Sequence, residues 1–249
     1  MSAPVLRTLI VGGLVLVLEV LCRTGVVGRH TIIPPSRMVA ELWALTLSGA
    51  IAPHAARTFG NVAIAFAVSV LAGVVIGVGL YALPRLRRAV DPLLATWYAM
   101  PVFVFYPLFV VLFGMGDLPI IAIGVLFAAA AMVIATLNGI ERIPRVLRKT
   151  SAVMRLGGAR RVLFIDLPSA LPYLLTGVKL ALAYAFIGVI ASEFILSGVG
   201  LGHEIAFAYN NFDNRTMYAL MLLLIVVVTL ANAVVHGWEQ RTLSRRGRN

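Results

Sequence analysis

The sequence predicts an all-α, polytopic membrane protein with about six transmembrane helices. Three observations predict this fold class. Hydrophobic residues make up 61% of the 249 residues and charged residues 12%, whereas a soluble domain carries about 25% charged residues. The apolar residues gather in runs of about 20 residues, the length that a helix needs to cross a bilayer. The arginines and lysines lie between these runs, as the positive-inside rule requires.

The first apolar segment, Leu9 to Cys22, is short and contains Glu19. A secretory signal peptide, with Arg7 as its basic flank, is the alternative interpretation. No small-x-small cleavage pattern follows the segment, so we favour a retained helix. Cys22 is the only cysteine in the sequence, which leaves no intrachain disulfide and argues against a cysteine-based metal site.

A short amphipathic helix is predicted next, in "PPSRMVAELWALTLSG", directly after a Pro-Pro pair. Its apolar side chains recur at helical spacing. That face could lie along the membrane surface or cover the helix bundle. Its residues are Val39, Leu42, Trp43 and Leu47.

Five longer runs are predicted to span the membrane, because each has about 20 residues or more and almost no charge. Only the fourth run contains charged residues, Lys179 and Glu193. The five runs are Thr58 to Ala82, Pro92 to Gly116, Leu118 to Ile140, Leu167 to Phe194 and Thr216 to Val235.

With six helices both termini lie on one side of the membrane, and arginine and lysine indicate which side it is. Fifteen of these residues fall on the side of the termini and five on the other, with Lys179 left out because it lies within a span. The bias predicts that both termini are cytoplasmic and that Glu141 to Asp166 is the largest cytoplasmic loop. It also accounts for the formal net charge of +11, so no nucleic-acid partner is expected. No polar block is long enough to fold alone, which predicts one transmembrane domain over residues 1–249 with a core of about 54–240.

Two spans carry small residues at four-residue spacing. Such stripes let transmembrane helices approach closely, so the sequence predicts tight packing along both of them. The stripes are Ser69, Gly73 and Gly77 in one span and Gly177, Ala181 and Ala185 in the other.

Pro101 and Pro107 each remove a backbone donor within one apolar run. Such breaks persist at membrane depth only where neighbours, side chains or water satisfy the freed carbonyls. A kinked helix beside a transport pathway is one interpretation, and a purely structural kink is the other.

Polar side chains within the predicted spans are few. Lys179 and Glu193 could mark a functional site or an ion pair, although both lie toward span ends. Lys179 could snorkel to the cytoplasmic surface, and Glu193 lies near the outer interface. Asn61 and Asn138 are expected to hydrogen-bond neighbouring helices.

Catalytic patterns are absent from the sequence. None of the four histidines stands at metal-ligand spacing from a second ligand, and no G-x-x-x-x-G-K-[ST] phosphate loop is present. The glycine cluster from Gly198 to Gly202 lies in an outer connection and follows no strand. We therefore expect no catalytic residue, no metal and no cofactor; an energised process would need a nucleotide held by another polypeptide.

The cytoplasmic loop predicts two short helices. "RVLRKTSAVMRL" suits a first helix, which Gly157 and Gly158 break, and "ARRVLFIDL" suits a second. Pro168 and Pro172 are then expected to set the turn into the next span. Two short helices that protrude from the membrane could bind in a groove of a partner and pass on its movement. Alternatively, the helix pair could rest on lipid. The apolar faces are Val146, Leu147, Val153 and Met154 in the first helix and Val162, Leu163 and Ile165 in the second.

The stretch "LGGARRVLFIDLPSALPYLLTGVKLAL" resembles the coupling loop of ABC-importer permeases, the inner-membrane components of binding-protein-dependent transport systems. The signature of that family is Glu-Ala-Ala, three residues, Gly, a helix and then Leu-Pro. Gly157, Leu167 and Pro168 match it. Ser151-Ala152-Val153 stands in place of Glu-Ala-Ala, and the interval from the glycine to the proline is shorter than usual.

Other segments resemble the nitrate/sulfonate/taurine-type branch of the same family. "IIPPSRMVAELWAL" resembles its Pro-Pro-Ser lead-in, and "ASEFILSGVGLGHEIAFA" resembles a later segment. "WEQRTLSRR" resembles its basic tail, with Glu239, Arg241 and Leu243 matching. The resemblance thus extends over nearly the whole chain.

This resemblance implies a type I ABC importer permease fold, with the coupling loop at about 141–168, in a bacterial inner membrane. It implies a homodimer of two permease copies around a pathway, a periplasmic binding protein that delivers the solute, and two cytoplasmic ABC ATPase subunits. The solute would be small and anionic or polar, such as a sulfonate, nitrate or taurine.

The resemblance also implies two sets of functional residues. Contact with the ATPase is expected at Ala152, Leu156, Gly157, Gly158, Ala159, Leu163, Leu167 and Pro168. The substrate pathway is expected at Met100, Pro101, Phe105, Tyr184, Ser192 and Glu193.

A secondary transporter or channel that works without an ATPase is the competing class. It should show inverted repeats or a paired intramembrane charge relay, and the sequence shows neither. A membrane-embedded enzyme is disfavoured by the missing catalytic cluster.

Overall fold

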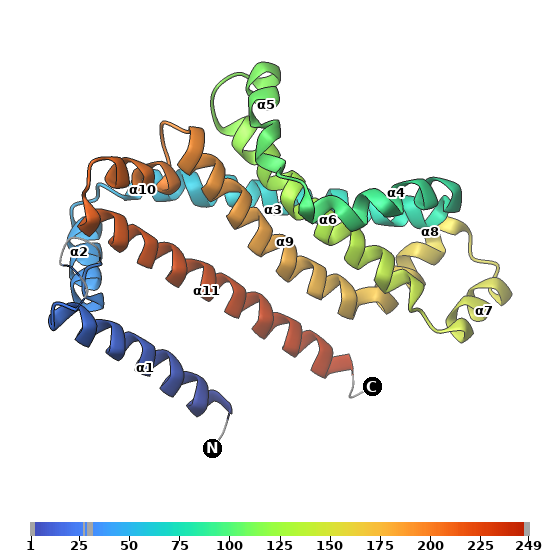
Figure 1. The fold of residues 1–249 in the computed structure, drawn as a ribbon. Helices are drawn as coiled ribbons and strands as arrows, with labels where there is room; N and C mark the ends of the chain where they lie inside the picture. The colour runs from blue at the N-terminus through green and yellow to red at the C-terminus, as the bar shows by residue number, and fades with distance from the viewer. Residues whose placement is uncertain (1–2, 27, 29–31, 247–249) are drawn as a thin grey trace. The chain divides into compact units, whose positions relative to one another are not determined.

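The computed structural model describes residues 3–26, 28 and 32–246, and these residues form helices and no strands. Figure 1 labels the helices in chain order. Four of them are long and apolar enough to cross a membrane: Ala52–Ala82, Asp117–Glu141, Gly158–Leu196 and Asn214–Ser244. This confirms the predicted all-α, membrane-spanning fold class.

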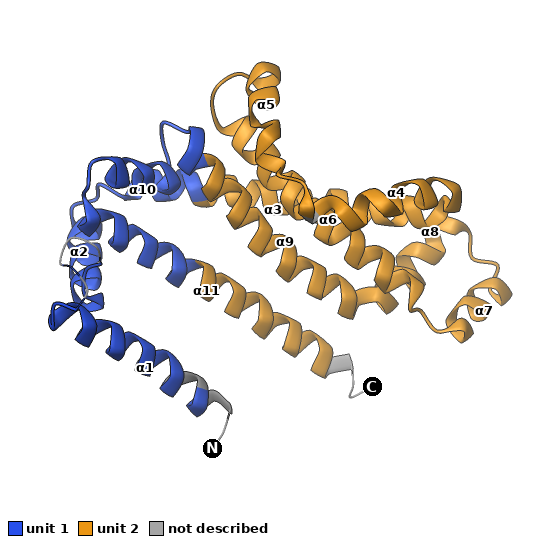
Figure 2. Ribbon diagram, in the orientation of Figure 1, with its two compact units in different colours: residues 1–58, 193–227 blue, residues 59–192, 228–249 orange. Residues whose placement is uncertain are grey.

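The contacts divide the chain into two compact units, coloured separately in Figure 2. The first unit comprises Met1–Thr58 and Glu193–Val227, and the second comprises Phe59–Ser192 and Val228–Asn249. Three of the long helices, α3 (Ala52–Ala82), α9 (Leu167–Leu196) and α11 (Asn214–Arg246), contribute to both.

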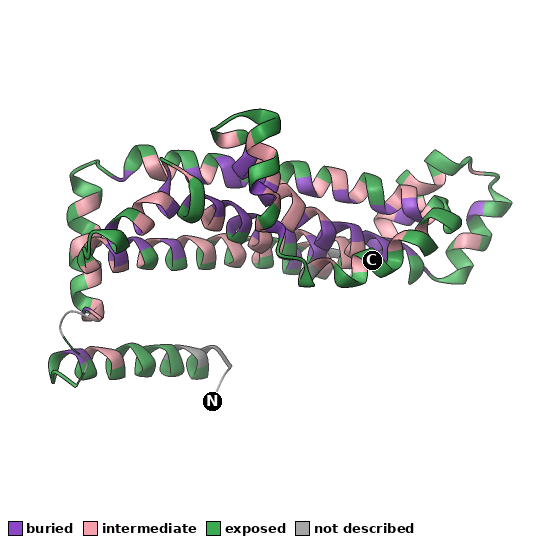
Figure 3. Ribbon diagram, turned by 45° about the horizontal axis from the view of Figure 1, so that its top comes forward, coloured by how far each residue is buried: buried purple, intermediate pink, exposed green. Residues whose placement is uncertain are grey.

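In the first unit, α1 (Ala3–Arg23) contains the predicted Leu9 to Cys22 segment and is exposed along most of its length (Figure 3). The predicted amphipathic helix is confirmed as α2 (Pro35–Leu47), which begins at the second proline, where a missing N–H costs nothing. The apolar face of α2 is largely exposed, including Trp43 at 66%. The remaining helix of the unit, α10 (Leu201–Asn210), was not predicted.

In the second unit, α6 (Asp117–Glu141) packs between α3 and α9 and is the most buried of the long helices. The two stripes of small residues make this packing possible. A Cβ atom on Gly73 would lie 2.4 Å from Met132 Cβ of α6, and one on Gly177 would lie 2.5 Å from Ala135 Cβ. The predicted tight packing along both stripes is therefore confirmed.

The predicted span from Pro92 to Gly116 is wrong as a single helix. The structure divides it into α4 (Pro84–Thr96), the 3-10 turns η1 (Trp97–Ala99) and η2 (Val102–Phe105), and α5 (Tyr106–Phe113). Met100 has an extended backbone with ψ 129°, because the residue before a proline is driven out of the α region. Pro107 lies in the first turn of α5 and does not break it.

The loop after α6 contains α7 (Arg145–Val153), which confirms the first predicted short helix. The break that ends α7 lies at Arg155, with φ +48°, and not at the glycines. Leu156 N–H donates to Ser151 O and Arg155 N–H donates to Ala152 O, which is the Schellman pattern. Gly157 has φ −62° and ψ 157°, a conformation open to most residues.

The turn expected at Pro168 and Pro172 is also absent. The short helix α8 (Gly158–Arg161), the π-helical segment η3 (Val162–Asp166) and α9 form one continuous helix of 39 residues. The π turn lies just before Pro168, where the wider helix gives the proline ring room that an α turn denies it. The second predicted loop helix is thus a direct extension of the following span.

Candidate functional site

The end of α6 and the start of the loop are joined by the side chain of Arg148. Its guanidinium donates hydrogen bonds to Ile140 O at 2.9 Å and to Glu141 O at 3.2 Å. These carbonyls belong to the last turn of α6, where Ile140 O also accepts from Ile143 N–H at 3.4 Å and where the helix dipole favours a cation. The guanidinium also lies 5.8 Å from the ring of Tyr81 in α3. Arg148 therefore links α7 to two long helices.

Two neighbouring arginines add links at the same end of α6. Arg142 lies 5.3 Å from the ring of Tyr173 in α9. Arg87 of α4 pairs with Glu141 and with Asp91, and the hydrogen bond with Glu141 raises the pKa of Arg87 above its already high ordinary value. The two arginines thus tie the helices that surround the loop to one another.

The extension formed by α8 and η3 is held by an ion pair. Arg161 Nε lies 3.3 Å from Asp166 Oδ2, and Asp166 is 2% exposed. The two residues are five apart in sequence, and the i to i+5 pattern of a π turn brings such residues onto one face. The ion pair and the π turn thus support each other at the base of the loop.

The predicted coupling residues lie along this loop and its extension. Ala152 is in the last turn of α7, and Leu156 and Gly157 lie in the connection that follows. Leu163 is 62% exposed, as is Met154, while Val153 is 83% exposed. The structure places an exposed apolar surface between arginines at this point. The other predicted coupling residues, Gly158, Ala159, Leu167 and Pro168, lie in α8 and the first turn of α9.

The predicted pathway residues of the second unit fall on two elements. Met100 and Pro101 form the extended break after η1, and Phe105 ends η2. Tyr184 and Ser192 lie on α9, where the Ser192 hydroxyl donates to Gly188 O at 2.7 Å. The broken segment is anchored to α6, since Trp97 Nε1 donates to Leu126 O at 3.2 Å. The hydrogen bond from Trp97 thus holds the broken segment against α6 within the second unit.

The sixth pathway candidate, Glu193, lies in the first unit and is fully buried. Its carboxylate accepts a hydrogen bond from the Thr58 hydroxyl at 2.7 Å and one from Gly202 N–H at 3.1 Å. These contacts fix its position among three helix ends. Sequence analysis identified Glu193 as notable but did not identify Thr58.

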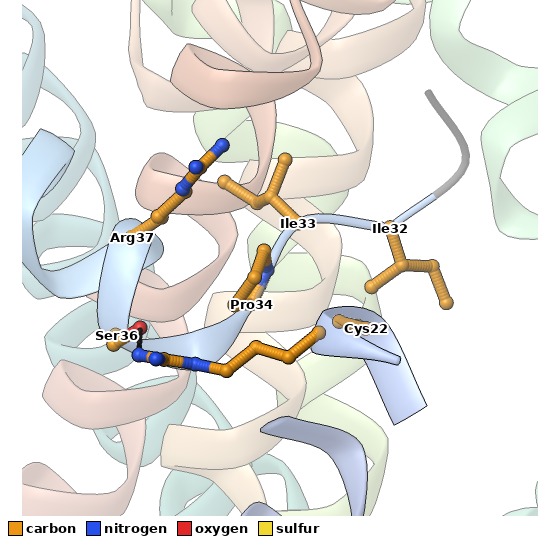
Figure 4. Close-up of a pocket in the computed structure, with 7 residues that line it drawn as sticks. Cys22, Ile32, Ile33, Pro34, Ser36 and Arg37 are labelled. Atoms are coloured by element: carbon orange, nitrogen blue, oxygen red, sulfur yellow. Dashed lines mark hydrogen bonds between the residues drawn. The ribbon is translucent and has the colours of Figure 1, made fainter. Parts of the chain in front are cut away.

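A hollow of about 280 Å³ lies where α1 meets α2 in the first unit (Figure 4). Arg23 Nε donates to Glu19 Oε1 of the same helix at 2.6 Å, and Arg23 Nη2 donates to Ser36 Oγ at 3.4 Å. Arg37 points away from Ser36 in Figure 4. Glu19, the charge within the first predicted span, is therefore paired. The hollow is lined by Cys22, Arg23, Ile32, Ile33, Pro34, Ser36 and Arg37, none of which was predicted as a pathway residue.

The polar side chains predicted in the spans have varied partners. Asn61 donates to Asp117 Oδ1 of α6 at 3.0 Å, which confirms the expected bond between helices. Asn138 is exposed beside a hollow between α4 and α6. Lys179 forms an ion pair with Glu239 of α11, and His236 Nδ1 lies 3.2 Å from the same carboxylate.

Replacing Lys179 with methionine should destabilise the protein, because it leaves the largely buried Glu239 carboxylate without its cation. We expect a loss of about 1–3 kcal/mol, less than for a fully buried pair because Lys179 is partly exposed. Thermal unfolding in detergent measures the change. The double variant Lys179→Met, Glu239→Gln should regain most of the loss, and equal melting of Lys179→Met and the parent would disprove the role of the pair.

The most informative residues that sequence reasoning missed are Arg148 and Thr58. Arg148 was counted only as a cytoplasmic charge, although a cation eight residues after the end of an apolar run can fold back onto the helix terminus. Thr58 stood at the edge of a predicted span, and no sequence signal connects it to Glu193.

Long apolar helices packed through small residues, a broken segment, and an arginine-linked loop with exposed apolar side chains define a polytopic membrane protein. The comparisons agree. Residues 69–247 match the family model of the binding-protein-dependent transport system inner membrane component. The chain belongs to this family, and it is a permease subunit of an importer of the ABC type.

Curated relatives support the assignment. The chain is 26% identical over 219 residues to the nitrate import permease protein NrtB of Leptolyngbya laminosa, covering 84% of this chain and 78% of NrtB. It is 27% identical over 228 residues to the putative aliphatic sulfonates transport permease protein SsuC of Bacillus subtilis, covering 92% and 83%. It is 24% identical over 215 residues to the taurine transport system permease protein TauC of Escherichia coli, covering 84% and 78%.

The fold is also found in solved structures. A structure of the MetNI methionine ABC transporter in an inward-facing conformation aligns with a TM-score of 0.66 at 20% identity, covering 74% of this chain and 92% of that chain. A second crystal form aligns with a TM-score of 0.59 over 97% of this chain and 99% of that chain.

Proposed function

We propose that the protein is the permease of an ATP-driven importer for a small anionic or polar organic solute in a bacterial inner membrane. Two copies form the pathway, a periplasmic binding protein delivers the solute, and both termini are cytoplasmic. ATP hydrolysis belongs to a separate pair of cytoplasmic subunits. The relatives named for nitrate, aliphatic sulfonates and taurine support the solute class, and the distribution of arginine and lysine supports the orientation.

The observation that carries the proposal is the exposed apolar surface of the α7–α8 loop. Val146 is 71% exposed, Val153 is 83% exposed and Phe164 is 68% exposed, and all three stand among arginines in the sequence. Exposed apolar groups rimmed by polar residues mark docking surfaces. On the cytoplasmic side, this surface would seat in the ATPase, together with the predicted coupling residues from Ala152 to Pro168.

Two structural links would transmit a movement of this surface to the membrane-spanning helices. Arg148 connects α7 to the end of α6, and α8 is continuous with α9. α6 and the part of α9 up to Ser192 belong to the second unit, together with the broken segment at Met100 and Pro101. Movement of the loop would therefore alter the packing around the proposed pathway. This transmission does not require Gly157 and Gly158 to act as a hinge.

Val153→Asp should prevent the ATPase from docking, because it places a charge at the most exposed apolar position of α7. The permease is co-expressed with the ATPase of its own transport system, and co-purification is measured alongside ATP-dependent uptake in proteoliposomes. We expect both to fall by about tenfold or more.

Met115→Asp is the matched control, since Met115 is 93% exposed in the turn before α6 and the proposed topology places it on the outer side. It should retain the ATPase. If Val153→Asp also retains the ATPase, the docking surface lies elsewhere. If the parent accumulates solute without any ATPase, the protein is a secondary transporter or channel. Uptake by the parent of nitrate, an alkanesulfonate and taurine, each with its binding protein, tests the solute class.

A further inference from the structure

The start of α10 has three successive backbone N–H groups, and a side chain accepts a hydrogen bond from each. Gly200 N–H donates to His54 Nδ1 at 3.3 Å, and Leu201 N–H donates to Thr58 Oγ1 at 2.8 Å. Gly202 N–H donates to Glu193 Oε2 at 3.1 Å. The first N–H groups of a helix have no partner within it, and the helix dipole favours a negative charge there. The Glu193 carboxylate therefore serves as a cap that comes from a different helix.

Thr58 connects the pieces of this arrangement. Its hydroxyl donates to Glu193 Oε2 at 2.7 Å while it accepts from Leu201 N–H. Thr58 lies near the start of α3, Glu193 lies near the end of α9, and both are buried. A single hydroxyl thus joins three helix ends, all of which belong to the first unit.

The glycine cluster that follows α9 is explained by the same arrangement. Gly200 has φ +116°, and a Cβ atom there would lie 2.4 Å from Glu193 Cδ and 2.5 Å from Oε2. Any side chain at Gly200 would displace the carboxylate. An added Cβ at Gly198 would have no atom within 4 Å, so a side chain at this position would not disturb the carboxylate.

We infer that Thr58 and Glu193 are positioning residues that clasp α10 to the ends of α3 and α9, and that this clasp carries the binding protein's signal into the permease. The inference rests on the proposed function, which places these helix ends on the outer side. α10 presents exposed side chains there, among them Phe207 at 57% and Tyr209 at 62%. A partner that presses on α10 moves α3 and α9 only while the clasp holds.

The test compares Thr58→Val with Thr58→Ser in proteoliposomes that contain the permease and its ATPase, with and without the binding protein. Valine keeps the shape of threonine but removes both hydrogen bonds of the hydroxyl. We expect stimulation of ATP hydrolysis by the binding protein to fall about tenfold in Thr58→Val, with basal hydrolysis within about twofold of the parent. Thr58→Ser should restore the stimulation. A parallel fall of basal and stimulated hydrolysis, or an unchanged Thr58→Val, overturns the inference.

Hydrogen exchange of the segment 198–205 tests the clasp independently of transport. We expect Thr58→Val and Gly200→Ala to accelerate exchange at Leu201 and Gly202, and Gly198→Ala to match the parent. Equal protection in all four proteins would refute the clasp even if uptake is normal. Conversely, a parent that shows the protection but no ATP-dependent uptake contradicts the proposed function and not the geometry.

Discussion

Replacing Gly77 with leucine should abolish the accumulation of folded protein. A Cβ atom at this position would lie 2.6 Å from Thr136 Cβ and 3.2 Å from Val133 O, both in α6. The second contact is with backbone, so α3 and α6 would have to separate. Overpacking costs about 1–3 kcal/mol even where side chains can yield, and the whole stability of a domain is about 5–15 kcal/mol. We expect little or no monodisperse protein in size-exclusion chromatography after detergent extraction.

Gly79→Leu is the matched control, because Gly79 lies on the same helix two residues away and has nothing within 4 Å of an added Cβ. Its yield and melting temperature should match those of the parent. Gly77→Ala should give an intermediate result, since one methyl group adds less volume. If Gly77→Leu yields as much monodisperse protein as Gly79→Leu, the close approach of α3 and α6 is refuted.

Replacing Arg148 with alanine should uncouple ATP hydrolysis from transport. The change removes the two hydrogen bonds to the last carbonyls of α6 and the contact with Tyr81. The exposed apolar surface of α7 remains, so the ATPase should still dock. Because α7 could then move without α6, we expect uptake to fall by about tenfold or more while ATP hydrolysis persists. The ratio of solute transported to ATP hydrolysed in proteoliposomes measures the effect.

Lys149→Ala is the control, since it removes the neighbouring charge from an exposed position of the same helix. Arg148→Lys should recover only part of the coupling, because an ammonium lacks the planar fork that reaches two carbonyls. An unchanged transport ratio in Arg148→Ala would show that the signal enters by α8 and α9 alone. Loss of ATPase binding in that variant would instead make Arg148 part of the docking surface.

Much of the fold follows from features that are local in sequence. Length and hydropathy identify α3, α6, α9 and α11, because a span needs about 20 apolar residues whatever surrounds it. Spacing alone identified the stripe of Gly73 and Gly77, and the side of α2 that carries Trp43. The family signature drew attention to the loop at Gly157.

The errors lie where a local rule competes with packing. Gly157 and Gly158 were predicted to break the first helix of the loop, but the left-handed residue that ends this helix is Arg155, which the Schellman hydrogen bonds hold. Pro168 was predicted to start a turn, but a π turn keeps the helix continuous. Propensity is a weak prior, and tertiary context overrides it. The break at Pro101 was recognised as a kink, yet not as a division of the segment into separate helices.

The sequence by itself determined that this protein crosses a membrane and which loop resembles a coupling element, and its arginines and lysines predict the orientation. Hydropathy, charge and short motifs carry that information within a few neighbouring residues. Only the tertiary structure decided that Thr58 meets Glu193, that Lys179 meets Glu239, and that Arg148 returns to the end of α6. Thr58 and Glu193 are 135 residues apart, and such pairings depend on which helix faces pack together, which one-dimensional patterns leave open.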